Sequence, residues 1–176
     1  TESNKPKITS DVDNGYVKND IRIFGDVDVH EVYRTGQNYS FKSIVAEHDC
    51  TLVQTYGTLN IGGSVSAPEK TLTFKFGRTT DKAYFNPGVT FAGSVNASLV
   101  FEQIDGSYVN PITFKGVSSN PDSKLTVGVG ECKFESTAKW AGTNIVLQAN
   151  ATKLTVNGSS NLSPDMYMSI LNDAKI

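Results

Sequence analysis

Charge, cysteine and long apolar runs are all scarce in this chain. Among its 176 residues there are 16 basic and 18 acidic side chains, and the formal net charge is only -2. Nucleic-acid binding draws on an excess of Lys and Arg that displaces counterions from phosphate, so this balance argues against a nucleic-acid partner. No stretch approaches the roughly 20 apolar residues that a helix needs to cross a bilayer, and we expect no membrane insertion.

Only two cysteines occur, Cys50 and Cys132, which is too few for a small disulfide framework. We expect two buried thiols without chemistry. A single long-range disulfide is one alternative, and a reactive Cys50 beside His48 and Asp49 is another.

Motifs of turnover enzymes and of cofactor sites are also missing. A hydrolase would need two carboxylates that converge on one bond, and the sequence spacing of the four candidate acidic residues does not indicate which two would do so. These residues are Asp81, Glu102, Asp105 and Glu131. Gly128 and Gly130 lie in a strand-like run without phosphate-loop spacing. No motif therefore indicates a cofactor, which leaves nucleotide and divalent-metal binding open.

Neutral polarity takes the place of charge, because Asn, Ser and Thr make up about a quarter of the sequence. The dominant apolar period is two. Leu72 and Phe74 alternate with Thr71, Thr73 and Lys75, which is typical of a half-buried strand. The same alternation recurs in further segments, whose apolar residues are Ile21, Ile23, Val27 and Val29; Val89, Phe91 and Val95; Leu99 and Phe101; Ile112 and Phe114; Leu125, Val127 and Val129; Ile145 and Leu147; and Leu154 and Val156.

Short strands separated by turn signals, with no amphipathic helix between them, predict an all-β fold. A sandwich or jelly roll is the leading prediction, and a stack of β-solenoid rungs is the alternative. We expect one β-rich domain over residues 21–176, preceded by a polar segment, 1–20, that holds a candidate cleavage region. A short C-terminal helix is also expected, since Ser163 suits its cap, Pro164 its first position and Asp165 its first turn.

Two segments about thirty residues apart look alike, Gly-Ser-Val-Ser-Ala at 63–67 and Gly-Ser-Val-Asn-Ala at 93–97. The likeness suggests paired hairpins. Two copies alone do not establish a repeat.

One predicted strand carries a candidate metal site, formed by Asp26, Asp28 and His30. Alternate residues of a strand lie about 6 to 7 Å apart on one face, so two carboxylates and an imidazole can reach a common divalent cation. A solvated strand face, or charges that prevent edge pairing, is the simpler interpretation.

A candidate self-cleavage region comprises Ser10, Asp11, Asp13 and Asn14. Cleavage without a protease needs a nucleophile, an acid or base and an accessible peptide bond, and this segment supplies a hydroxyl, two carboxylates and the unhindered Gly15. The alternative is an ordinary polar turn before the first strand.

Aromatic side chains offer a third kind of surface, because their rings stack on sugars. The candidates are Tyr16, Tyr33, Tyr39, Tyr56, Tyr84, Tyr108, Trp140 and Tyr167. Aromatic residues on strands are more often core or interface residues, so no single one stands out.

A helix-poor chain of short strands, rich in Asn, Ser, Thr and Gly, resembles the distal modules of bacteriophage tail spikes and fibres. More locally, Ser10-Asp11, followed by Lys18, Asn19 and Asp20, is similar to the junction where the carboxy-terminal intramolecular chaperone of tail spikes and endosialidases cuts itself free. The resemblance implies that Ser10 and Asp11 flank the cut, or that Asp13 and Asn14 do so in a divergent member.

The resemblance also implies a homotrimer that assists the folding of an N-terminal spike shaft in the same polypeptide. Such a protein folds in the host cytoplasm and ends in the virion tail, outside the cell. Its only catalysis would be a single self-cleavage. The alternative is the receptor- or glycan-binding head of a phage fibre or bacterial adhesin, with a cell-surface glycan as its partner.

Overall fold

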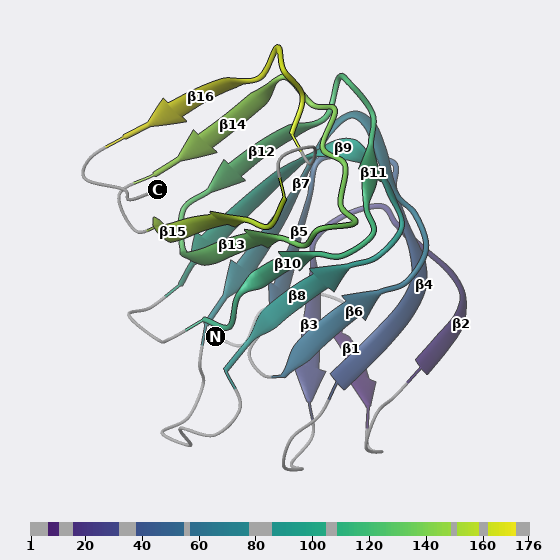
Figure 1. The fold of residues 1–176 in the computed structure, drawn as a ribbon. Coiled ribbons are helices and arrows are strands. Elements are labelled where there is room, and N and C mark those ends of the chain that lie inside the picture. The colour runs from purple at the N-terminus through teal and green to yellow at the C-terminus, as the bar shows by residue number, and fades with distance from the viewer. Residues whose placement is uncertain are drawn as a thin grey trace.

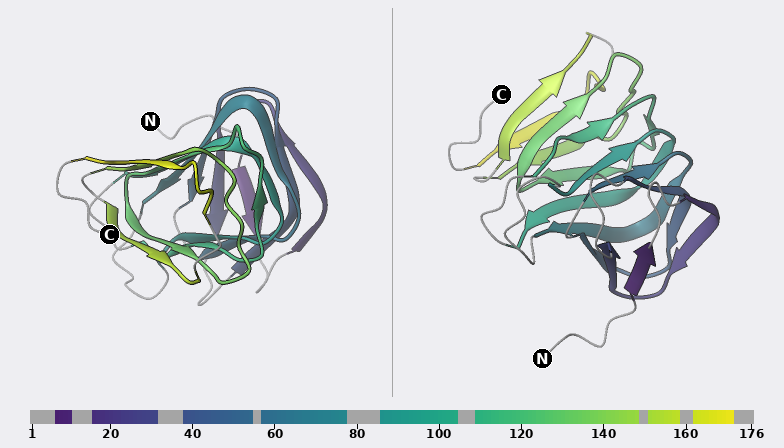
Figure 2. Two further views of the ribbon diagram at one scale, coloured as in Figure 1. Left: turned by 45° about the horizontal axis from the view of Figure 1, so that its top comes forward. Right: turned by 90° about the horizontal axis from the view of Figure 1, so that it is seen from below.

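In the computed structural model the chain winds into a parallel β-solenoid with three sides and about five complete turns (Figure 1). The structure describes residues 7–10, 16–31, 38–54, 57–77, 86–104, 109–148, 151–158 and 162–171. These residues form strands, turns and bends and no helix. Figure 2 shows the closed cross-section from one direction and, from another, the strands stacked from the purple N-terminal turns to the yellow C-terminal turns.

Each side of the solenoid is a ladder of parallel strands from successive turns. The first side consists of the first residues of β2 (Tyr16–Ile23) and β4 (Asn38–Ala46), followed by β6 (Thr58–Ile61), β8 (Gly88–Phe91), β10 (Ile112–Phe114), β13 (Gly130–Phe134) and β15 (Ala151–Val156). The second side consists of the last residues of β2 and β4, the first residues of β7 (Val65–Phe76) and β9 (Ser94–Gln103), and β11 (Ser118–Ser119). The third side consists of β1 (Lys7–Ser10), β3 (Val27–Glu31), β5 (Cys50–Gln54), the last residues of β7 and β9, β12 (Lys124–Val127), β14 (Asn144–Leu147) and β16 (Tyr167–Ile170).

The core is a set of columns that run through the solenoid from turn to turn. Parallel register places equivalent residues of successive turns directly above one another. Each inward-facing apolar side chain therefore packs on the apolar side chain at the same position of the next turn. The rings of Phe91, Phe114 and Phe134 form such a column on the first side, with centroid separations of 5.0 Å and 4.8 Å. From the third side, Phe74 meets Phe91 edge to face at 5.6 Å. These contacts join two sides of the solenoid into one core.

The corners depend on buried polar contacts and on glycine. The buried amide of Gln54 donates to the carbonyl oxygens of Gly57 (2.6 Å) and Gly88 (2.9 Å), so one side chain satisfies the backbone of two successive turns. At another corner Gly93 lies directly over Gly63, where a Cβ atom would collide with the Gly63 carbonyl. That corner therefore accepts only glycine at position 93.

The expected sandwich or jelly roll is wrong, and the alternative prediction of β-solenoid rungs is the one confirmed. Alternating apolar and polar residues usually indicate an antiparallel sheet with one wet face, because most parallel sheets are covered on both faces. A solenoid gives parallel strands the same alternation, since each strand faces the core on one side and solvent on the other. The similar segments 63–67 and 93–97 are adjacent turns in parallel register, not hairpins: Val65 pairs with Val95 and Ala67 with Ala97.

The expected C-terminal helix is also wrong. The hydroxyl of Ser163 accepts a hydrogen bond from the Asp165 N–H (3.3 Å), and the Met166 N–H donates to the Ser163 carbonyl (3.2 Å), which makes a single turn. The chain then forms β16, which pairs with β14 in parallel register, Ile145 opposite Met168. The free edge of β14 provides backbone hydrogen-bond partners for these residues. Pairing with β14 is more stable than a short isolated helix, whose first turn is costly to form.

Candidate functional site

The outer surface of the first side carries a row of polar side chains at regular spacing. The row follows one outward column through successive turns, about 4.8 Å apart. Its members are Ser40, Asn60, Thr90, Thr113, Lys133 and Thr155. Hydroxyl and amide groups in such a row can donate and accept hydrogen bonds, and Lys133 is the one cation among them.

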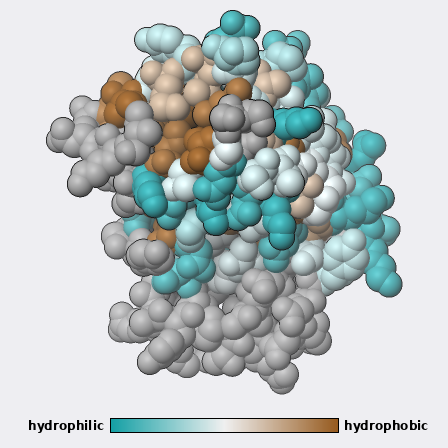
Figure 3. Space-filling view, viewed as in Figure 1, coloured by the Kyte–Doolittle hydropathy of each residue, from teal (hydrophilic) through white to brown (hydrophobic). Residues whose placement is uncertain are grey.

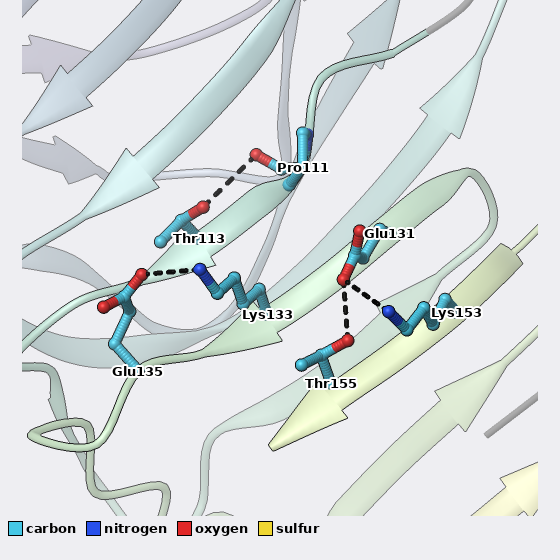
Figure 4. Close-up of polar contacts among 7 residues, drawn as sticks. All are labelled: Pro111, Thr113, Glu131, Lys133, Glu135, Lys153 and Thr155. Carbon is cyan, nitrogen blue, oxygen red and sulfur yellow. Dashed lines mark hydrogen bonds and ion pairs between the residues drawn. The ribbon is translucent and has the colours of Figure 1, made fainter. Parts of the chain in front are cut away.

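Near the C-terminal end of this row the charged groups pair with one another (Figure 4). Glu131 Oε1 accepts a hydrogen bond from Thr155 Oγ1 (2.6 Å) and lies 3.5 Å from Lys153 Nζ. Lys133 Nζ lies 3.0 Å from Glu135 Oε1. No sequence pattern indicates the contacts from Glu131 to β15, because they join residues more than 20 positions apart. These charges lie on an open strand face and neutralise one another, an arrangement that suits a solvated surface better than acid–base catalysis.

The carboxylates considered for a hydrolase do not converge in the described part of the chain. Glu102 is on the third side, where Oε2 pairs with Lys75 Nζ at 3.1 Å. Glu131 is on the first side. Asp81 and Asp105 lie outside the described residues. The two described carboxylates point from different sides of the solenoid, so together they cannot flank one bond.

Asp26 lies at the corner before β3, where Oδ1 accepts a hydrogen bond from the Thr51 N–H (2.9 Å) of the next turn. Asp49 does the same one turn later, accepting from the Thr71 N–H at 2.7 Å. Both aspartates thus fasten a corner to the start of the following third-side strand. Sequence reasoning missed this role, although each Asp lies one residue before a strand on the third side.

The other two metal candidates, Asp28 and His30, are on β3, and their side chains lie outside the described part of the structure. Over the residues whose positions are described, no three His, Cys, Asp or Glu side chains gather as a metal site would require. The metal site at Asp26, Asp28 and His30 stays a prediction.

Only Ser10 of the self-cleavage region falls on a described element, as the last residue of β1. Its backbone pairs with Glu31 of β3 in parallel register. Asp11, Asp13 and Asn14 lie outside the described residues. Self-cleavage at this segment therefore stays a prediction.

Both thiols are free and buried, on different sides of the solenoid. Burial raises the pKa of Cys50, and the carboxylates of Asp26 and Asp49 add to the effect, while its contact with the His48 carbonyl opposes it. Burial also raises the pKa of Cys132 far above its ordinary range. A raised pKa keeps a thiol protonated, so neither cysteine is prepared for nucleophilic attack.

The aromatic candidates for sugar stacking divide into buried, exposed and undescribed residues. Trp140 is buried and packs edge to face on Phe114 and Phe134. Tyr16 and Tyr167 are exposed, at opposite ends of the solenoid. The side chains of the remaining tyrosines lie outside the described residues: Tyr33, Tyr39, Tyr56, Tyr84 and Tyr108.

In the last described turn, two apolar side chains that continue buried columns are partly exposed. In the column of Phe134, which is fully buried, the last member is Val156, 37% exposed. In the column of Leu147, also fully buried, the last member is Ile170, 44% exposed. Figure 3 shows the brown apolar surface gathered over the C-terminal turns around β14 and β16. At the other end, Phe24 is exposed after β2.

Comparison of this chain with models of protein families, with curated proteins and with solved structures finds no match. None of the described residues belongs to a helix that is long and apolar enough to span a membrane. The function must therefore be inferred from the geometry of the solenoid itself.

Proposed function

We propose that this chain is an assembly segment of a surface appendage of the phage tail-spike type, in which three copies associate and the end turns stack on neighbouring β-structure. The observation that carries the proposal is the last described turn, where Val156 and Ile170 continue two core columns and are partly exposed because no further described strand covers them. Exposed strand edges with apolar side chains are the usual site of β-sheet extension.

The outer surface of the third side also favours association. One outward column there carries no charge: Thr51, Thr73, Val100, Thr126, Val146 and Ser169. In the flanking outward columns Lys75 and Glu102 neutralise each other at 3.1 Å, and Lys124 contributes one exposed positive charge. Copies that approach along this side would meet little electrostatic repulsion.

An assembly role also suits the way the solenoid folds. Every ladder joins strands of different turns, so a turn can form its hydrogen bonds only against a turn that is already in place. The chain entropy lost in closing each turn is therefore lost before its contacts form. A segment that associates early would lower this cost for the shaft in which it is embedded. Release by self-cleavage near Asp13 belongs to the same proposal.

The test is the oligomeric state of the chain, measured by light scattering and sedimentation equilibrium at roughly tens of micromolar. We expect a trimer. Ile170→Lys should weaken the association, because it puts a charge on the uncovered turn. Ile104→Lys is the matched control, since Ile104 is 56% exposed but follows β9 in the middle of the solenoid. A monomeric wild-type chain would overturn the proposal. If Ile170→Lys and Ile104→Lys weaken the association equally, the exposed turn around Ile170 is not where the copies associate.

A glycan-binding head of a phage fibre or bacterial adhesin is the second candidate, and the polar row on the first side favours it. Hydroxyl and amide groups at one per turn are the groups that hydrogen-bond to sugars. A glycan array distinguishes the two functions. An assembly segment should give no signal, whereas a binding head should give one that Thr113→Val reduces, because that substitution keeps the side-chain shape and removes the hydroxyl.

A further inference from the structure

The first-side ladder ends in an exposed Asn-Gly dipeptide. The Asn157 N–H donates to the Phe134 carbonyl (2.9 Å), which continues the ladder one residue beyond β15. Gly158 follows in a bend with φ of 100°, a backbone conformation that favours glycine. Both residues are exposed to solvent.

We infer that Asn157–Gly158 is a site of spontaneous deamidation, at which the last turn of the solenoid gains a negative charge with time. The backbone nitrogen of Gly158 attacks Cγ of Asn157 and loses its proton. The Cγ–Nδ2 bond breaks, ammonia leaves, and a five-membered succinimide remains. Water then opens the ring at one of its two carbonyls and gives aspartate or isoaspartate. The only co-reactant is water.

The neighbouring residues explain why this asparagine stands apart. The reaction needs an unhindered N–H on the following residue, and Gly158 has no Cβ to block the attack. Three other described asparagines precede proline, which has no N–H to act as the nucleophile: Asn86, Asn110 and Asn120. The rest lie on strands and precede bulkier residues: Asn19, Asn38, Asn60, Asn96 and Asn144.

The new carboxylate would lie beside an existing one. Phe134 pairs with Val156, so continuing this register places Glu135 opposite residue 157. Lys133 Nζ lies 3.0 Å from Glu135 Oε1, and a second carboxylate would compete for this single cation. Like charges opposite each other on adjacent strands destabilise a sheet. Isoaspartate would also add a methylene to the backbone where the ladder ends. Deamidation should therefore loosen the last described turn, the one in which Val156 and Ile170 are exposed.

The experiment is peptide mapping by mass spectrometry after incubation of the intact chain in mildly alkaline buffer. We expect the exchange of amide for carboxylate at Asn157, with isoaspartate as a product, at a rate several-fold above that of Asn60, Asn96 and Asn144. Asn14–Gly15 is the same dipeptide outside the described residues, and the map reads it separately. An Asn157 that stays intact, or changes no faster than the strand asparagines, overturns the inference.

Three variants keep the test independent of a folding defect. Gly158→Ala should slow the reaction several-fold. Because residue 158 has a positive φ, alanine at this position would also strain the bend. Asn157→Gln leaves Gly158 in place and should abolish the change at position 157, because a six-membered ring closes far more slowly. Asn157→Asp should melt below Asn157→Gln if the charge opposite Glu135 loosens the turn. Equal rates in the wild-type chain and Gly158→Ala would count against a succinimide route.

Discussion

Replacing Phe114 by alanine should be among the most damaging substitutions in the solenoid. Its ring is fully buried between those of Phe91 (5.0 Å) and Phe134 (4.8 Å), and Trp140 meets it edge to face at 5.3 Å. Truncating a buried Phe to Ala costs about 3 to 5 kcal/mol. Three aromatic partners, each worth about 0.5 to 1.5 kcal/mol beyond burial, place the loss toward the upper end of that range. A loss of about 4 to 5 kcal/mol lowers the folded-to-unfolded ratio by roughly a thousandfold to several thousandfold.

The assay is urea unfolding followed by far-UV circular dichroism and by the fluorescence of Trp140, the single tryptophan. Coincident curves from the two probes would justify a two-state free energy. Phe24→Ala is the matched control, because Phe24 is 66% exposed and its loss should change stability by no more than about 0.5 kcal/mol. If Phe114→Ala falls within about 1 kcal/mol of that control, the stacked column does not hold the core together and the reasoning fails.

Two further predictions test the interior. Burial raises the pKa of Cys132 in the folded chain, so above roughly pH 8.5 only the unfolded chain loses the thiol proton, and the free energy of unfolding should fall by up to about 1.4 kcal/mol per pH unit. Denaturant titrations at several alkaline pH values should show a shallower fall of this free energy with pH for Cys132→Ala, and the same fall in both proteins would contradict the raised pKa of Cys132. Gly93→Ala should severely destabilise the chain, because its Cβ would collide with the Gly63 carbonyl, whereas Gly62→Ala, with open space around the new Cβ, should be mild in the same thermal melts.

The alternation of apolar and polar residues predicts most of the core correctly. Leu72, Phe74 and Phe76, which the alternation assigns to one face, are all buried. The alternation does not reveal the direction of pairing, because a strand with one apolar face suits an antiparallel sandwich and a parallel solenoid equally well. The similarity of residues 63–67 to 93–97 is the one local sign of stacked turns.

The candidate sites are less predictable than the core. Asp26 is a predicted site residue, but its contact with the Thr51 N–H depends on how one turn rests on the next. The contact of Glu131 with Thr155 arises in the same way. Ser163 predicts a helix because capping is a local property, whereas the edge of β14 that draws the chain into β16 is not visible locally.

The all-β class, the inward faces of the strands and the low charge of the surface all follow from the order of the residues alone, since each depends on residue type and on neighbours two positions away. The fold was needed to establish that the strands pair in parallel, that phenylalanines stack into columns and that Val156 and Ile170 are exposed in the last described turn. The difference lies in distance along the chain. A backbone N–H or an apolar side chain in one turn finds its partner one whole turn away, and no local pattern specifies which turn that will be.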